Sequence, residues 1–277
     1  GVKLFVLDMD GTVYLGNHMI DGALDFIHEV DASEDRDYIF FTNNASRVPS
    51  VYVEKLHKLG LDVDESKVVT AGDVCAEFLK VNYPGAKVYL NGTPVLEENW
   101  KEKGIHLVEE DPDVAVQSFD TTLTYHKLDR ICHYVRNGVP FIATHMDTNC
   151  PTEYGFMPDC GAMCSLITDS TGVKPRFLGK PWKETVDMVA EITGYKAEEM
   201  AFVGDRLYCI HRNYNNYGLD QDALLDLLHY TNFVTGTLYI KNPNDNYMIF
   251  KKEDVKFNDV EIGFDKGIEF MQRRNSN

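Results

Sequence analysis

Short apolar runs that end abruptly at polar residues recur along this chain. Residues 4–7 (LFVL), 38–41 (YIFF) and 200–203 (MAFV) contain no alternation of polar and apolar positions. Such runs are typical of strands buried on both faces of a parallel sheet. Helical stripes at residues 21–30 and 49–59 follow the first two runs. The pattern predicts an α/β fold with a doubly wound, mostly parallel sheet.

The first run ends in two acids and a glycine. Asp8 and Asp10 are two residues apart in Leu7-Asp8-Met9-Asp10-Gly11, so in an extended segment their side chains point to the same side. Open α/β sheets bind ligands at the carboxyl ends of their strands. The pair is therefore a candidate site for chemistry on one small target, and a solvated acidic turn is the alternative.

The second run ends in a hydroxyl- and amide-rich segment, Thr42-Asn43-Asn44-Ala45-Ser46, ahead of the helix expected at 49–59. Ser and Asn are preferred helix N-caps, so capping is the simplest interpretation of this segment. Amides at a helix N-terminus also bind anions. Capping and anion binding are therefore both open at this position.

A second set of strand and helix patterns occupies the middle of the chain. At 277 residues the sequence is long for one domain and short for two full α/β domains, which favours one core with an inserted module. We place the core at 1–78 and 178–277 and an inserted, smaller α/β cap at 79–177. The strands and helices expected after residue 60 are 67–70, 72–81, 86–91, 94–103, 114–117, 123–137, 141–144, 182–193, 219–228, 237–240 and 247–250.

Charge and cysteine usage limit the classes of partner. With 27 Lys and Arg against 44 Asp and Glu the formal net charge is −17, so we expect neither nucleic acid nor a membrane surface as a partner. Six cysteines without a CxxC pair, and no apolar run of membrane-spanning length, indicate a reduced, cytoplasmic protein. Cys160 and Cys164 are interpreted as buried small hydrophobes, with a metal site as the alternative.

Four segments together resemble the motifs of the haloacid dehalogenase-like phosphatases. They are the strand followed by DMDGT, then FFTNNAS, GKP and VGDRLY. The resemblance implies a Mg²⁺-dependent phosphatase in which the first acid attacks phosphorus, the second is the acid/base, and an aspartyl-phosphate forms. The roles it implies are Asp8 and Asp10 as catalytic, Thr42, Asn43 and Lys180 as phosphate-binding, and Asp8, Asp10 and Asp205 as metal ligands. Without that context Lys180 would be interpreted as a solvated surface lysine.

Residues 145–164, HMDTNCPTEYGFMPDCGAMC, are similar to the sequence pattern ATNxDxxxPxxxGxxPGxGAxxA. That pattern belongs to the large-cap branch that includes NagD-like and 4-nitrophenyl phosphatases. The resemblance implies that the cap sets substrate specificity, with Asp147, Asn149, Asp159 and Met163 as candidates to touch the leaving group. An ordinary polar loop is the alternative for each of them.

The resemblance ends before the chain does. The fourth motif of the family continues to a second acid, and Ile210 stands at that place here. The leading interpretation is a phosphatase acting on small phosphorylated metabolites such as sugar phosphates, nucleotides or aryl phosphates. A degenerate member that binds a phosphorylated ligand or partner without turnover is the alternative, and a phosphotransferase or mutase is a third. The physiological substrate and any homodimer are left open.

Overall fold

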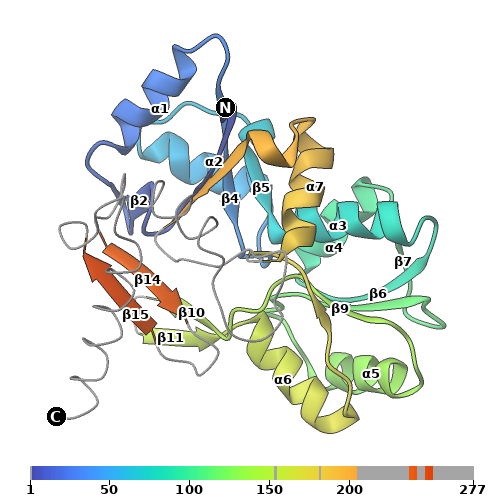
Figure 1. Ribbon diagram of the computed structural model, residues 1–277. Helices are drawn as coiled ribbons and strands as arrows, with labels where there is room; N and C mark the ends of the chain where they lie inside the picture. The colour runs from blue at the N-terminus through green and yellow to red at the C-terminus, as the bar shows by residue number, and fades with distance from the viewer. Residues whose placement is uncertain (1, 153–154, 181, 205–236, 242–246, 252–277) are drawn as a thin grey trace, which may run out of the picture. The chain divides into compact units, whose positions relative to one another are not determined.

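The computed structural model describes residues 2–152, 155–180, 182–204, 237–241 and 247–251 (Figure 1). By backbone contacts the chain divides into two compact units. One contains residues 1–40 and 198–277, and the other contains residues 41–197. The boundary at residues 40 and 41 falls inside a strand, β4, so this strand contributes to both units.

The first unit contains a parallel pair of strands, β1 and β13, and two antiparallel pairs, β2 with β3 and β14 with β15. Its sheet has β1 between β13 and β4, and β1 pairs with β13 from Leu4 opposite Met200 to Leu7 opposite Val203. The edge-to-face contact of Phe5 and Phe26, with ring centroids 5.1 Å apart, joins β1 to α1. The elements are β1 (Leu4–Asp8), β2 (Tyr14–Leu15), β3 (His18–Met19), α1 (Ala23–Asp31), β4 (Asp37–Thr42), η2 (Ala197–Glu199), β13 (Met200–Val203), β14 (Thr237–Lys241) and β15 (Tyr247–Lys251).

The second unit contains a five-stranded parallel sheet in the order β12-β9-β8-β6-β7. A separate antiparallel hairpin is formed by β10 and β11. The elements of the second unit are α2 (Pro49–Lys58), η1 (Glu65–Lys67), β5 (Val68–Thr70), α3 (Ala71–Asn82), β6 (Lys87–Asn91), α4 (Pro94–Glu102), β7 (His106–Leu107), β8 (Val114–Gln117), α5 (Tyr125–Arg136), β9 (Phe141–Ala143), β10 (Asn149–Thr152), β11 (Gly155–Pro158), α6 (Cys160–Thr171), β12 (Arg176–Phe177) and α7 (Lys183–Thr193).

Helices α5 and α6 lie side by side on one face of the five-stranded sheet (Figure 1). Their apolar faces meet the sheet through a buried cluster that includes Ile131, Val135, Cys164 and Ile167. Burial of apolar surface is the main source of stability for such a layered arrangement. Cys160 and Cys164 are both buried in this cluster, which confirms their interpretation as buried small side chains.

Polar side chains fix where several helices of the second unit begin. Thr70, Thr93, Thr124 and Asp159 stand at the N-caps of α3, α4, α5 and α6, and each accepts a hydrogen bond from a backbone N–H of the first turn. These bonds satisfy donors that have no partner inside the helix. The positions of the helices are therefore set locally by the sequence.

The predicted strands and helices up to residue 203 are all present, with ends that differ by one or two residues. The two strands expected after residue 236 are also present, as β14 and β15. The pattern did not reveal the short strands β2, β3, β7, β10, β11 and β12, because none of them contains three consecutive apolar residues. The helix expected at 219–228 lies outside the described residues.

The division into a core and an inserted cap at 79–177 stays a prediction, although the five-stranded sheet does lie within residues 87–177. Where the structure is described, it contains no helix with the length and apolarity needed to cross a membrane.

Candidate functional site

Asp8 is the last residue of β1, and a tight loop follows it. The Asp8 carboxylate accepts a hydrogen bond from the Met9 backbone N–H at 2.9 Å, while Met9 itself is buried. The backbone amides of residues 12–14 all donate to the Met9 carbonyl, and Gly11 has a φ of 84° that favours glycine. This loop leaves Asp8 half-buried and Asp10 exposed, so two carboxylates stand at the end of one strand.

The polar segment after β4 organises its own loop. Thr42 and Asn43 are buried, and the Thr42 hydroxyl oxygen accepts from the Asn44 N–H at 3.1 Å. Asn44 Oδ1 in turn accepts from the Ser46 N–H at 2.9 Å and from its hydroxyl at 2.7 Å. The N-cap of α2 is Val48, whose side chain makes no cap bond. The capping interpretation of this segment is therefore wrong, because the N-cap lies outside it and its Thr42 and Asn44 side chains bind within the loop.

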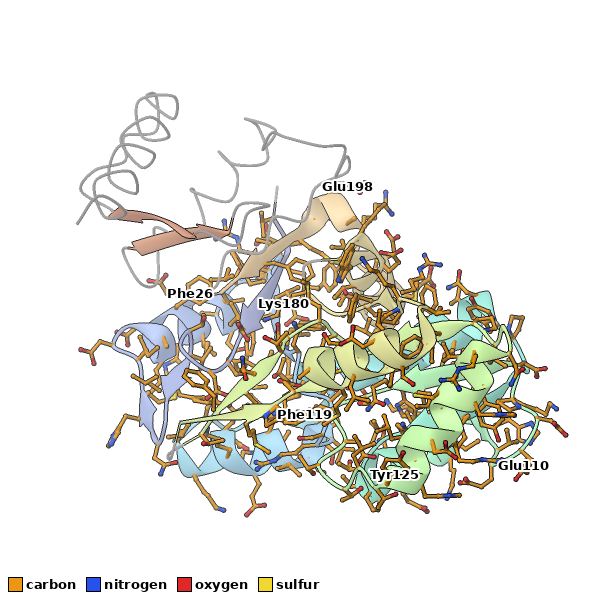
Figure 2. The ribbon with its side chains drawn as sticks, turned by 90° about the horizontal axis from the view of Figure 1, so that it is seen from below. Phe26, Glu110, Phe119, Tyr125, Lys180 and Glu198 are labelled. Carbon is orange, nitrogen blue, oxygen red and sulfur yellow. The ribbon has the colours of Figure 1, made fainter. Side chains whose placement is uncertain are left out.

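Lys180 is buried beside this loop, with 8% of its surface exposed (Figure 2). Asn43 Oδ1 accepts from the Lys180 backbone N–H at 2.8 Å, and Asn43 Nδ2 donates to the Lys180 carbonyl at 3.2 Å. The Lys180 ammonium lies 5.4 Å from the centroid of the Phe41 ring. The interpretation as a solvated surface lysine is wrong, since the fold brings this residue to the end of β4 across 137 positions of sequence.

The four residues expected to contact a leaving group have different environments. Asp147 is half-buried and accepts from Asn43 Nδ2 at 3.3 Å, which joins it to the Lys180 loop. Asn149 is exposed on β10, and the Met163 sulfur lies 3.3 Å from the side-chain amide of Gln117. Asp159 is buried at the start of α6, where its carboxylate accepts from the Cys160 N–H at 2.6 Å.

A buried histidine that the sequence reasoning did not select lies next to these residues. His145 has no exposed surface, and its Nε2 is 2.8 Å from Asp159 Oδ1. Its Nδ1 is 3.0 Å from the Thr144 hydroxyl. The available signal was the family pattern ATNxD, which has Asn at the position of His145, and its PGxG segment, which has Gly at the position of Asp159. His145 and Asp159 are thus two departures from the family pattern within one segment, and their side chains contact each other in the structure.

Electrostatics favour the charged form of this histidine. Burial by itself would lower the pKa of His145, but the negative charge of Cys160, the hydrogen bond and charge of Asp159, and the charge of Asp147 together raise it to about 9. Burial opposes ionisation of Cys160 as well. A hydrogen bond from Cys164 and the positive charge of His145 nevertheless lower the pKa of this thiol to about 7. In its imidazolium form His145 donates from both ring nitrogens, to Asp159 and to the Thr144 hydroxyl oxygen.

Comparison with known proteins identifies the family. The sequence model of the haloacid dehalogenase-like hydrolases matches residues 5–106. An acid sugar phosphatase of Staphylococcus aureus is 37% identical over 204 residues, which cover 73% of this chain and 78% of that protein. The chain belongs to the haloacid dehalogenase-like hydrolases.

Solved structures of this family confirm the α/β fold. A 4-nitrophenylphosphatase from Thermotoga maritima is 42% identical and has a TM-score of 0.70, covering 75% of this chain and 79% of its own. A glycerol phosphate phosphatase from Mycobacterium tuberculosis, in complex with calcium, is 30% identical with a TM-score of 0.67, and the match covers 74% of this chain and 61% of that one.

One cluster in this haloacid dehalogenase-like chain has the composition of a metal site. Ligand atoms of His145, Asp147 and Asp159 all lie within 4.8 Å of one another. Two of these groups, His145 Nε2 and Asp159 Oδ1, lie 2.8 Å apart, so a hydrogen bond accounts for this contact without a metal. Asp205, the ligand implied by the fourth motif, and Ile210 lie outside the described residues.

Proposed function

We propose that this chain is a Mg²⁺-dependent phosphatase that hydrolyses small phosphate monoesters through an aspartyl-phosphate on Asp8. Its family is one of hydrolases, and the relatives described above are named as phosphatases of sugar, aryl or glycerol phosphates. The observation that carries the proposal is the burial of Lys180 and its anchoring by Asn43. Lysine side chains are rarely buried, so a buried ammonium near the end of β4 fits the phosphate-binding role that the motif implies.

Thr42, Asn43 and Lys180 would hold the phosphoryl group. The Lys180 ammonium supplies a fixed positive charge, and the Asn43 side chain fixes the backbone that carries it. The Thr42 hydroxyl oxygen accepts from Asn44, so its hydrogen is directed elsewhere and can be donated to a phosphoryl oxygen. Preorganised donors of this kind stabilise the charge on the equatorial oxygens in the transition state.

The carboxylates at the end of β1 would perform the covalent chemistry. An Asp8 oxygen attacks phosphorus, the bond from phosphorus to the leaving oxygen breaks, and Asp10 donates its proton to that oxygen. Asp10 then takes a proton from water as the water oxygen attacks phosphorus. The phosphorus–Asp8 bond breaks, releasing inorganic phosphate, and both side chains return to their starting states.

The donor set at β1 fits a hard divalent cation. Asp8 and Asp10 offer oxygen ligands on one loop, and the family motif adds Asp205. Oxygen ligands are those that Mg²⁺ prefers. When bound, the metal supplies positive charge against the carboxylates and the phosphate dianion. The net charge of −17 makes such local positive charge necessary for an anionic substrate.

Ile210 favours a second candidate, a family member that binds a phosphorylated ligand or partner with little turnover. It replaces the second acid of the fourth motif, which in the family binds the metal directly or through water. If catalysis persists, we expect Ile210 to raise the Mg²⁺ concentration needed for half-maximal rate. We also propose a cytoplasmic location, which is supported by the free thiols of Cys75, Cys132, Cys160 and Cys164.

Hydrolysis of 4-nitrophenyl phosphate across a Mg²⁺ titration tests the proposal. We expect turnover that Asp8→Asn abolishes and that Lys180→Met lowers by about 10²-fold or more in kcat/KM. The matched control is Lys183→Met, an exposed lysine paired with Asp187, which should leave kcat/KM unchanged.

Turnover that survives Asp8→Asn would refute the nucleophile. If the folded wild-type protein binds inorganic phosphate but gives no turnover at any Mg²⁺ concentration, the second candidate is the correct one.

A further inference from the structure

The buried pair of His145 and Asp159 takes no part in the proposed chemistry, yet it is tightly organised. Asp159 binds the His145 ring at 2.8 Å and also caps α6 through the Cys160 N–H. Thr144 holds the other ring nitrogen at 3.0 Å. Phe119 packs edge-to-face on the imidazole, with centroids 6.4 Å apart. The orientation of this ring is therefore fixed on several sides.

The same segment packs against the glycine that precedes Lys180. A Cβ placed on Gly179 would lie 2.8 Å from His145 Cβ, 2.9 Å from Asn43 Oδ1 and 2.9 Å from the Thr144 carbonyl oxygen. Gly179 also has a φ of 74°, so both space and conformation require glycine there. The Lys180 backbone is thus held by Asn43, while the residue before it is in close contact with His145.

Further bonds join the two sides of this contact. The Leu178 N–H donates to the Ala143 carbonyl at 2.9 Å, so residues 143–145 run directly beside residues 178–180. Asp147, two residues after His145, accepts from the Asn43 side chain. The charged or titratable groups around His145 are Asp159 at the N-cap of α6, Cys160 in the first turn of α6, and Asp147 in the loop after β9.

We propose that His145 and Asp159 act together as a positioning pair for the phosphate-binding loop. By fixing residues 143–147 against Gly179, they hold Asn43 and the Lys180 backbone in the geometry that binds a phosphoryl group. The inference rests on the proposed role of Asn43 and Lys180 in phosphate binding. The family pattern has Asn and Gly at these two positions. In this chain His and Asp stand there instead, and each gives the other a hydrogen-bond partner.

A double-mutant cycle tests the coupling. The variants are His145→Asn, Asp159→Gly and the double variant, which restores the family pattern at both positions. Lys103→Gln is the matched control, because it breaks a different partly buried ion pair, at 2.7 Å from Asp73, in the same unit. Each is examined for inorganic-phosphate inhibition, kcat and KM with 4-nitrophenyl phosphate, and amide hydrogen exchange at Lys180.

Each single variant leaves one buried polar group without its partner, so we expect about tenfold weaker phosphate binding, with KM raised more than kcat is lowered. The double variant should recover to within about threefold of the wild type. The Lys180 amide should exchange faster in the single variants and return toward wild-type rates in the double variant. Lys103→Gln should lower stability without changing phosphate binding or this exchange rate.

Single variants that fold, bind phosphate like the wild type and leave Lys180 exchange unchanged would overturn the inference. A double variant no better than the worse single variant would overturn it as well. If the wild type neither binds nor hydrolyses phosphate compounds, the proposed function fails. The exchange rates at Lys180 then still decide whether the pair positions this loop.

Discussion

Replacing Asn43 by Ala should loosen the Lys180 loop by a predictable amount. Asn43 is 6% exposed, and its side chain makes three hydrogen bonds: from the Lys180 N–H at 2.8 Å, to the Lys180 carbonyl at 3.2 Å and to Asp147 at 3.3 Å. Alanine removes all three and leaves the buried Lys180 N–H without its acceptor. The change therefore acts on a backbone N–H that the Asn43 side chain satisfies in the structure.

The size of the effect follows from the kinds of bond. An ordinary hydrogen bond contributes about 1 kcal/mol net, and a buried donor left unpaired costs about 1–3 kcal/mol. The longest bond, to the half-buried Asp147, contributes least because water can replace it. We therefore expect a loss of about 2–4 kcal/mol in local stability, which corresponds to about 30- to 1,000-fold faster exchange of the Lys180 amide.

Amide hydrogen exchange measured by NMR reads this local stability directly. Asn137→Ala is the matched control, since Asn137 is exposed at the end of α5 and its side chain donates to the His133 carbonyl at 2.8 Å. That substitution should change Lys180 exchange by less than about twofold. An Asn43→Ala protein whose Lys180 amide exchanges no faster than in the control would refute the reasoning about this buried donor.

Three further changes give distinct outcomes. Gly161→Ala should destabilise the protein by about 3 kcal/mol in urea unfolding, because its Cβ would lie 2.2 Å from the Met146 carbonyl oxygen. In an NMR titration the His145 ring should have a pKa of about 9, and Cys160→Ser should lower it by removing a negative charge. The raised pKa of His145 contributes folding stability that is complete below its ordinary pKa of 6.5 and is lost as pH rises through about 9. The lowered pKa of Cys160 contributes folding stability that is complete above 9.0 and is lost as pH falls through about 7. Because the two trends oppose each other, the free energy of unfolding should change little between pH 7 and 9 through this pair. Trp100→Phe should cost less than about 1 kcal/mol against about 3–5 kcal/mol for Trp100→Ala, because Nε1 of this buried indole has no hydrogen-bond partner among the described residues.

The strand ends were accessible from the sequence for a physical reason. Continuous apolar runs are rare outside buried strands, and a polar residue directly after such a run marks where the strand leaves the core. Asp8 and Thr42 were found in this way, and both lie where the pattern placed them, at the last position of β1 and of β4. The family motifs then assigned roles that the pattern alone left open.

Burial of charged side chains could not be predicted in the same way. Lys180 reads as a surface residue by its type, and the Asn43 bonds that hold its backbone join positions 137 residues apart. His145 gives no periodic signal, since it lies in the irregular segment after β9. Its partner Asp159 was selected for contact with substrate, whereas the structure places its carboxylate on His145 and on the first turn of α6.

The contact between His145 and Asp159 also limits how the sequence can diverge. A change at either position alone leaves a buried carboxylate or a buried ring without its partner, so most single steps away from the pair pass through a less stable protein. The two positions should therefore change together among related sequences, as His with an acid or as Asn with glycine. Mixed combinations are expected only where another side chain fills the vacant role. Residues 145 and 159 would then show correlated substitutions in an alignment of related sequences.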